Sequence, residues 1–289
     1  MTALRQRLIE DMQVRNYSPR TVEAYVAAVA KLAKHFMKSP DQLTSEELRG
    51  FQVHLLQLKT SWSQFNQIVC GLRFFYRTTL GRPEVVPMLP YGKKPKTLPV
   101  VLSMVEVAQL LAAAEFGRER LLFQTAYGCG LRLSELLRLQ VSDIDASRMV
   151  VTVRGGKGNK DRQVPLSARL LRELRAWWCT HRKKPWLFPG QTPGCPLSGG
   201  MVQRICRRVV ARAKLRKQAT MHTLRHSYAT HLLEAGVDVV TLQKLLGHND
   251  LSTTARYLHL STRQMQKLPS VLELLALPKE ETKAEVKDA

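Results

Sequence analysis

The chain has 289 residues, with 45 lysines and arginines against 23 aspartates and glutamates, which gives a formal net charge of +22. Neither a membrane-spanning apolar run nor a signal peptide is recognisable, so we expect an intracellular, cytoplasmic protein without membrane contact. The five scattered cysteines contain no CxxC pair, which argues against a disulfide framework and a zinc site. A charge this high is typical of proteins that bind polyanions, with a merely soluble basic surface as the alternative.

The N-terminal part of the chain, residues 1–82, is predicted to form a bundle of about four helices. One helix begins with Ser18 as its cap and Pro19 in its first position, and the next begins with a capping box of Thr44 and Glu47. The helices are expected over residues 3–15, 18–36, 44–58 and 62–79.

Prolines dominate the stretch that follows, residues 83–100. Their spacing forbids a helix across it, so we predict an extended linker between two domains. A linker that is also cationic can lie along DNA phosphates. Its candidate DNA-binding residues are Lys93, Lys94 and Lys96.

The second domain, expected over residues 101–277, is predicted to be mainly helical with a small antiparallel sheet. Val150, Val151 and Val153 indicate one strand, and the turn GGKGNKD leads to a returning strand RQVPL. Helices are expected over residues 104–115, 118–128, 132–139, 168–182, 199–214, 222–235, 239–246 and 252–259. Residues 278–289 are expected to be a disordered, charged tail.

One predicted helix of this domain carries a stripe of arginines without any acidic residue, in the segment RICRRVVARAKLRK. Such a stripe repels itself unless an anion relieves it, so we interpret it as a phosphate-backbone contact, with a solvated stripe as the alternative. The stripe consists of Arg204, Arg208, Arg212 and Arg216.

A further polar pair, His222 and Arg225, shares one face of a predicted helix because the two are three residues apart. No HExxH motif or carboxylate cluster accompanies them, so we expect no metal. Arg132, which follows a glycine break, could grip a phosphate in a bidentate manner.

Three more residues belong to the same set of candidates: Lys157 in the glycine-rich turn, His248 after a helix-ending glycine, and Tyr257 nine residues later. Taken singly, each is more often structural: a solvated turn, a helix cap or a core tyrosine. In their order along the chain, however, they form four motifs, which are GCGLRLSEL, GKGNK followed by VPL, HTLRHSYATHLLEAG and LGHNDLSTTARY.

These motifs resemble the tyrosine recombinase (phage-integrase) family, in particular its Xer-like bacterial branch, and the resemblance covers nearly the whole chain. It implies an N-terminal core-binding (SAM-like) helical domain and a mixed α catalytic domain with a small antiparallel sheet. It also implies an enzyme that cleaves and rejoins DNA through a 3′-phosphotyrosyl intermediate, for integration, excision or resolution, without metal or cofactor.

The resemblance implies a role for each candidate. Tyr257 would attack the phosphorus, and Arg132, Arg225 and His248 would stabilise the charge on the non-bridging oxygens. His222 would be the proton acceptor or another stabiliser. Lys157 would protonate the leaving 5′-oxygen, with Lys160 as its competitor, and Glu135 would orient the arginines as a structural support.

The implied partners are double-stranded DNA with short inverted-repeat core sites and three further protomers in a tetramer on two duplexes, formed either by this chain alone or together with a related recombinase. The segment 262–277 either packs on its own domain or, as we favour, docks on a neighbouring protomer. Two alternatives stay open: a catalytically inactive DNA-binding protein on the same scaffold, and a type IB topoisomerase-like activity.

Overall fold

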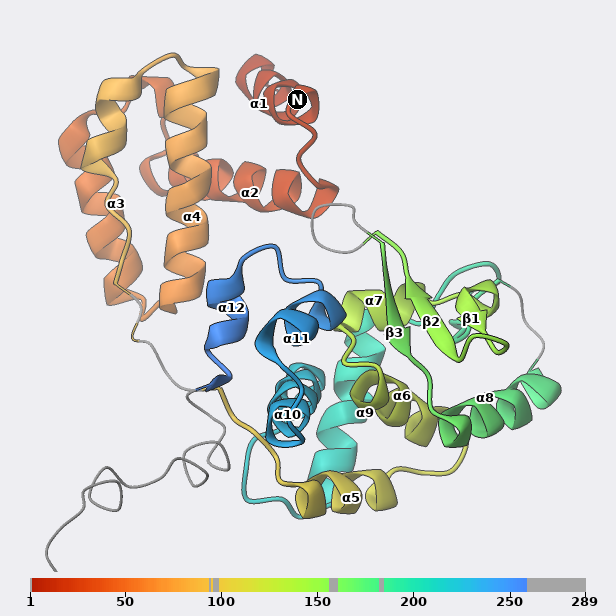
Figure 1. The fold of residues 1–289 in the computed structure, drawn as a ribbon. Helices are drawn as coiled ribbons and strands as arrows, with labels where there is room; N and C mark the ends of the chain where they lie inside the picture. Colours follow the sequence, from red (N-terminus) through yellow and green to blue (C-terminus); the bar gives the residue numbers. More distant parts are fainter. Residues whose placement is uncertain (1, 94, 96–98, 156–160, 182–184, 259–289) are drawn as a thin grey trace, which may run out of the picture. The chain divides into compact units, whose positions relative to one another are not determined.

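The computed structural model describes residues 2–93, 95, 99–155, 161–181 and 185–258. The chain divides into two compact units, Met1–Thr97 and Leu98–Ala289, and each has its own hydrophobic core. Figure 1 shows helices in both units and strands in the second. The mainly helical fold with one small sheet is the one predicted from the sequence.

The first unit is built from α1 (Ala3–Val14), α2 (Pro19–Phe36), α3 (Ser45–Gln57) and α4 (Trp62–Phe74), and a π-helical turn over Phe75–Thr79 extends α4. The predicted caps are present. The amide of Thr21 donates to Ser18 Oγ at 3.2 Å, and the amide of Thr44 donates to Glu47 Oε2 at 2.8 Å. These contacts satisfy donors that helix starts leave unpaired, and they fix where α2 and α3 begin.

The first part of the predicted linker is not extended. Residues Pro83–Met88 form a 3-10 helix, and Val85 and Leu89 are buried in the core of the first unit. Arg73 ties the segment down by donating from Nη1 to the Val86 and Leu89 carbonyls, at 3.1 and 2.9 Å. Proline excluded only an α-helix interior, because its fixed φ suits the first turn of a short 3-10 helix.

Only one of the three lysines predicted to bind DNA from the linker lies among the described residues. Lys93 is exposed, whereas Lys94 and Lys96 lie outside the described residues.

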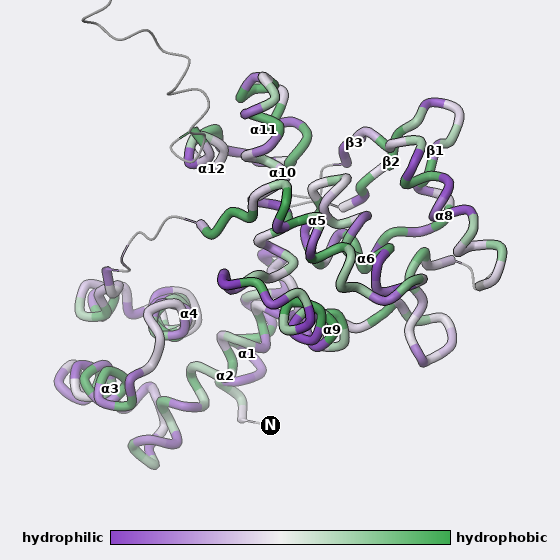
Figure 2. The backbone as a smooth tube through the Cα atoms, turned by 90° about the horizontal axis from the view of Figure 1, so that it is seen from below, coloured by the Kyte–Doolittle hydropathy of each residue, from purple (hydrophilic) through white to green (hydrophobic). Residues whose placement is uncertain are grey.

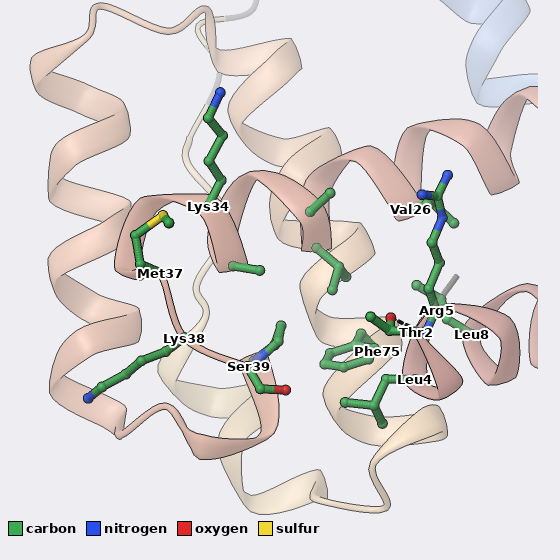
Figure 3. A pocket seen from close by; sticks show the side chains of 14 residues that line it. Thr2, Leu4, Arg5, Leu8, Val26, Lys34, Met37, Lys38, Ser39 and Phe75 are labelled. Carbon is green, nitrogen blue, oxygen red and sulfur yellow. Dashed lines mark hydrogen bonds between the residues drawn. The ribbon is translucent and has the colours of Figure 1, made fainter.

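A hollow of about 850 Å³ lies on the first unit, lined by residues of α1 and α2 and by the Met37–Pro40 connection. Figure 3 shows Leu4 and Phe75 at the hollow, whereas the amino groups of Lys34 and Lys38 point away from Phe75. Because its lining contains none of the residues predicted to act on DNA, this hollow is not the candidate active site.

The second unit contains a three-stranded antiparallel sheet with strand order β1-β2-β3 (Figure 1). Its strands are β1 (Ile144–Asp145), β2 (Val150–Val153) and β3 (Arg162–Pro165), of which β1 was not predicted. The register pairs Val153 with Arg162 and Val150 with Pro165. Val151 and Val153 point into the core, as the alternation along β2 requires.

Eight α-helices are described in this unit besides the sheet. They are α5 (Met104–Ala113), α6 (Arg118–Gly128), α7 (Leu133–Arg138), α8 (Ala168–His181), α9 (Gly199–Arg212), α10 (Met221–Glu234), α11 (Val239–Leu246) and α12 (Leu251–Ala255). Figure 2 shows hydrophobic and hydrophilic residues along the same helix in α9, which buries Val202, Ile205 and Val209. Among the described residues, no helix is long and apolar enough to cross a membrane.

Among the helices that end earlier than predicted, two have ends that affect candidate residues. Helix α9 stops at Arg212, and Lys214 adopts a left-handed conformation with φ 49°, so Arg216 lies beyond the helix and not on its stripe. Helix α12 stops at Ala255, so Tyr257 follows the helix instead of lying within it. Apolar periodicity alone did not reveal these ends, because both segments continue with apolar residues.

Candidate active site

Arg132 stands at the start of α7, directly after a sharp turn. The turn requires glycine: Gly130 has φ +58°, and a Cβ atom there would lie 2.4 Å from the Tyr228 ring. The backbone amide of Arg132 donates to Glu135 Oε2 at 2.8 Å, and its Nη1 donates to Oε1 of the same carboxylate at 2.7 Å. The first turn of α7 therefore fixes both the backbone and the side chain of this arginine.

Glu135 is a buried carboxylate that gathers three arginines. Its oxygens lie 2.7 Å from Arg132, 2.8 Å from Arg162 and 3.6 Å from Arg225. Burial acts to raise the pKa of Glu135, but hydrogen bonds from Arg162 and Arg132 lower it to about 2. The carboxylate therefore stays ionised and holds the guanidinium groups together. Arg162, which starts β3, was not singled out in the sequence.

The same three guanidinium groups also meet the end of α11. A helix C-terminus exposes carbonyl groups that carry partial negative charge, which attracts cations. Gly247, with φ +60°, ends the helix and turns the chain away. The bonds run from Arg162 Nε to the Leu245 carbonyl at 2.8 Å, from Arg225 Nη2 to the Leu246 carbonyl at 2.6 Å, from Arg132 Nη1 to the Leu246 carbonyl at 3.3 Å, and from Arg132 Nη2 to the Gly247 carbonyl at 3.3 Å.

Arg225 is the most deeply buried of these arginines, with 1% of its surface exposed. Its Nη1 donates to the Gly130 carbonyl at 2.7 Å, and its Nη2 lies 3.1 Å from His248 Nε2. Burial, and to a lesser extent repulsion from Arg132, lowers the pKa of Arg225 to about 10. The guanidinium is therefore still charged at neutral pH. The arginine therefore joins the α6–α7 turn, α11 and His248 at one point.

His248 is held from both ring nitrogens. Since a guanidinium can only donate, Nε2 of His248 accepts from Arg225, and Nδ1 carries the proton and donates to Thr254 Oγ1 at 2.9 Å. Burial and the charges of Arg225 and Arg132 lower the pKa of His248 to about 3. The imidazole is thus neutral, and its ring lies parallel to that of Tyr257, with centroids 6.4 Å apart.

Tyr257 is 3% exposed, and its hydroxyl lies 2.8 Å from Nδ1 of His226. Burial raises the pKa of the phenol, and Arg225 counteracts this in part. His226, which the motifs did not single out, packs its ring 4.3 Å from that of His222. A signal was present in the sequence: His226 lies one turn after His222 and directly after Arg225.

The structure therefore brings five of the predicted residues together: Arg132, Glu135, Arg225, His248 and Tyr257. His222, on the same helix, contacts the ring of His226, and it is His226 that bonds the Tyr257 hydroxyl. Partial burial and the charge of Arg225 lower the pKa of His222. Lys157 and Lys160 lie outside the described residues, as do the segments 262–277 and 278–289.

The arginine stripe of α9 is partly neutralised within the protein. Arg208 is ion-paired with Glu119, and Arg212 lies 3.1 Å from Glu115 and 3.3 Å from Glu119. Carboxylates just before α6 and in its first turn thus relieve the repulsion that we had assigned to an external anion. Arg204 is exposed.

A metal ion in the described part of the chain would need several ligating side chains close together. No group of three or more histidine, cysteine, aspartate or glutamate side chains there could hold a metal ion. Apart from the carboxylate of Glu135, the charged groups of the candidate active site are arginines, which suits an anionic ligand.

Comparison with known proteins gives matches in both units. The Phage integrase family matches residues 101–264, and the Phage integrase, N-terminal SAM-like domain matches residues 4–84. A putative integrase/recombinase, y4qK, of Sinorhizobium fredii (strain NBRC 101917 / NGR234) is 45% identical over 280 residues, covering 96% of this chain and 91% of the relative.

Two further relatives belong to the Xer group. The tyrosine recombinase XerA of Thermococcus onnurineus (strain NA1) is 35% identical over 263 residues, covering 89% of this chain and 91% of the relative. The crystal structure of the XerH site-specific recombinase bound to its palindromic difH substrate matches with a TM-score of 0.69 at 24% identity, over 89% of this chain and 81% of that one, and so supports the fold. The chain belongs to the phage integrase family and is a Xer-like, site-specific tyrosine recombinase.

Proposed function

We propose that this recombinase cleaves and rejoins double-stranded DNA through a 3′-phosphotyrosyl intermediate formed by Tyr257. The observation that carries the proposal is the convergence of Arg132 and Arg225 on the Leu246 carbonyl, beside His248 and Tyr257. A carbonyl oxygen that accepts from two guanidinium groups occupies a position suited to a phosphate oxygen.

In this proposal the cationic side chains share one phosphodiester. Arg132 and Arg225 neutralise the charge that gathers on the non-bridging oxygens as Tyr257 attacks in line. His222 adds a hydrogen bond to those oxygens, and His248 does so in its other tautomer, in which Nε2 carries the proton and Nδ1 accepts from Thr254. Glu135 keeps the guanidinium groups oriented, as its contacts with Arg132 and Arg225 suggest.

The leaving 5′-oxygen needs a proton, which we assign to Lys157, with Lys160 as the competing donor. The phosphotyrosyl ester keeps the energy of the broken bond, so rejoining requires no nucleotide cofactor.

We further propose that the partner is DNA with short inverted-repeat core sites and that four protomers act on two duplexes, with the segment 262–277 docked on a neighbour. The net charge of +22 supports a polyanionic partner. The XerH neighbour is described as bound to a palindromic substrate in a post-cleavage complex, which supports the same kind of partner here. The reaction would serve integration, excision or resolution of DNA.

Residues outside the candidate active site would add affinity for the phosphate backbone. We assign this role to Lys93, Lys94, Lys96, Arg204, Arg208, Arg212 and Arg216. Arg204 is exposed and suited to it as it stands, whereas Arg208 and Arg212 would have to exchange their carboxylate partners for phosphates.

The test uses a nicked duplex that carries the core site found by footprinting. The wild type should give an adduct that resists SDS, with a free 5′-hydroxyl on the other product, and Tyr257→Phe should give none. Tyr127→Phe is the matched control, because Tyr127 is also hydrogen-bonded to a histidine of α10.

Other outcomes would identify the alternatives. A stable footprint without any adduct from the wild type would indicate a non-catalytic DNA-binding protein. Relaxation of supercoiled DNA that lacks the core site, at the rate seen with the site, would indicate a topoisomerase-like activity.

A further inference from the structure

The hydroxyl of Tyr257 is hydrogen-bonded to His226, a residue to which the roles above assign no function. The Tyr257 oxygen lies 2.8 Å from His226 Nδ1, and the ring centroids are 5.5 Å apart. His226 projects from α10 one residue after Arg225 and one turn after His222. Its ring therefore stands at the nucleophile, on the same helix as two members of the proposed phosphate site.

The protonation states of the pair suit a transfer from the phenol to the imidazole. Burial is the main reason why the pKa of His226 is lowered to about 4. The charges of His222, Arg225 and Arg256 lower this pKa further. A neutral imidazole has one nitrogen free to accept a proton. Burial raises the pKa of the Tyr257 phenol, so the phenol holds its proton until something removes it.

We propose that His226 accepts the proton of Tyr257 as the phenol attacks the scissile phosphodiester. This inference rests on the proposed function. The bond between the Tyr257 oxygen and phosphorus forms while the bond from phosphorus to the 5′-oxygen breaks, and the phenolic proton moves to His226 Nδ1. The electron pair of the broken bond leaves with the 5′-oxygen, which takes its proton from the lysine donor proposed above. The reverse steps rejoin the strand.

The surroundings of His226 couple this transfer to DNA. In the free protein, an imidazolium at this position would face the cationic groups of Arg225 and Arg256, with His222 alongside. A phosphodiester bound against the arginines adds negative charge, which favours the imidazolium. Deprotonation of Tyr257 is therefore disfavoured until the substrate is in place.

Two variants separate proton transfer from positioning. In His226→Asn, the amide can still bond the Tyr257 hydroxyl from near the Nδ1 position, but it cannot accept a proton. His226→Ala loses both abilities. We expect cleavage of the nicked core-site duplex to be about 10²-fold slower or worse in both variants, with footprinting affinity close to that of the wild type.

The matched control is His231→Asn. His231 also lies on α10 and also bonds a tyrosine hydroxyl, that of Tyr127, through Nδ1 at 2.8 Å. The cleavage rate of the His231→Asn variant should stay within about twofold of that of the wild type.

A duplex with a 5′-bridging phosphorothiolate separates this role from that of the leaving-group acid, because sulfur departs without a proton. The defect of His226→Asn should persist on this substrate, whereas a Lys157→Ala, Lys160→Ala double variant should be rescued. The rate of His226→Asn should also rise with pH, as hydroxide replaces the missing base.

The results can separate the two proposals. If His226→Asn cleaves within about twofold of the wild type, or is rescued by the phosphorothiolate, His226 is not the proton acceptor, and the recombinase proposal still stands. If the wild type itself forms no adduct on a footprinted site, the proposed function fails first.

Discussion

Two tyrosine–histidine pairs on one helix invite comparison. Near its start, α10 presents His226 to Tyr257, and one to two turns later it presents His231 to Tyr127. In both pairs the tyrosine oxygen lies 2.8 Å from the histidine Nδ1. Local geometry therefore does not distinguish the pair that we assign to catalysis from the one that we do not.

The two pairs differ in the charges around them. His226 is surrounded by His222, Arg225 and Arg256, whereas the charged neighbour of His231 is Glu234. Burial lowers the pKa of both histidines, but only for His226 do cationic neighbours add to the effect. The comparison teaches that cationic surroundings, and not the hydrogen bond, distinguish the tyrosine that we propose as the nucleophile.

The largest effect should come from removing the central guanidinium. We expect Arg225→Ala to lower the cleavage rate by about 10³-fold or more, because a fixed donor to the developing phosphate charge is lost. Site binding, measured by footprinting, should change little. Arg204→Ala, in the exposed part of α9, is the control and should weaken binding without slowing cleavage of bound DNA. Normal cleavage by Arg225→Ala would break the comparison between the two pairs.

Next in size is the carboxylate that holds the arginines. Glu135→Gln leaves three guanidinium groups without their anion, so the free energy of unfolding should fall by about 3 kcal/mol, measured by urea denaturation. Glu119→Gln is the control, since Glu119 pairs with arginines whose side chains are 57% and 32% exposed, and it should cost about 1 kcal/mol. Equal losses would mean that burial of the arginine partners does not matter.

Lowering the pH should weaken the stabilising interaction between Glu135 and the arginines. Since the folded-state pKa of Glu135 is lowered from 4.5 to about 2, its contribution is present above pH 4.5 and is lost as the pH falls towards 2.

The histidine pKa values test the comparison directly. Histidine NMR titration should show His226 protonating near pH 4 and His231 at higher pH. Because the unfolded chain binds a proton near pH 6.5, the lowered value for His226 reduces stability as the pH falls from 6.5 to about 4. Core-site DNA should raise the midpoint of His226 but leave that of His231 unchanged. Equal shifts on adding DNA would contradict the assignment.

The smallest effect should come from the end of α11. Gly247→Ala should cost about 1 kcal/mol of unfolding free energy, because Gly247 has φ +60° and a Cβ there would lie 3.0 Å from Arg162 Cδ. Gly50→Ala, within α3 and with nothing within 4 Å of its Cβ, should be neutral or stabilising in the same denaturation experiment.

Local signals in the sequence were reliable where a few neighbouring residues decide the structure. The capping box at Thr44 and Glu47, the turn at Gly130 and the helix-ending Gly247 all act within one turn of the chain, so their patterns could be read directly. Helix ends without such a signal were missed, as at Arg212 and Ala255.

Partners that lie far apart in the chain could not be predicted in this way. Nothing near Arg162 in the sequence indicates that it bonds Glu135, and the stripe of α9 reads as unpaired until Glu119 is brought against it. Ion pairs of this kind form between elements that the core packs together, and the core is fixed by many weak contacts at once.

The sequence by itself determined the fold class, the family and the identity of most groups that we expect to act on phosphate, because these follow from composition, short motifs and their order. Only the tertiary structure decided which histidine touches the Tyr257 hydroxyl and which anions hold the arginines. The physical reason is that helical spacing places His222 and His226 on the same side of α10, and only the packing of the chain after α12 decides which of them meets the phenol.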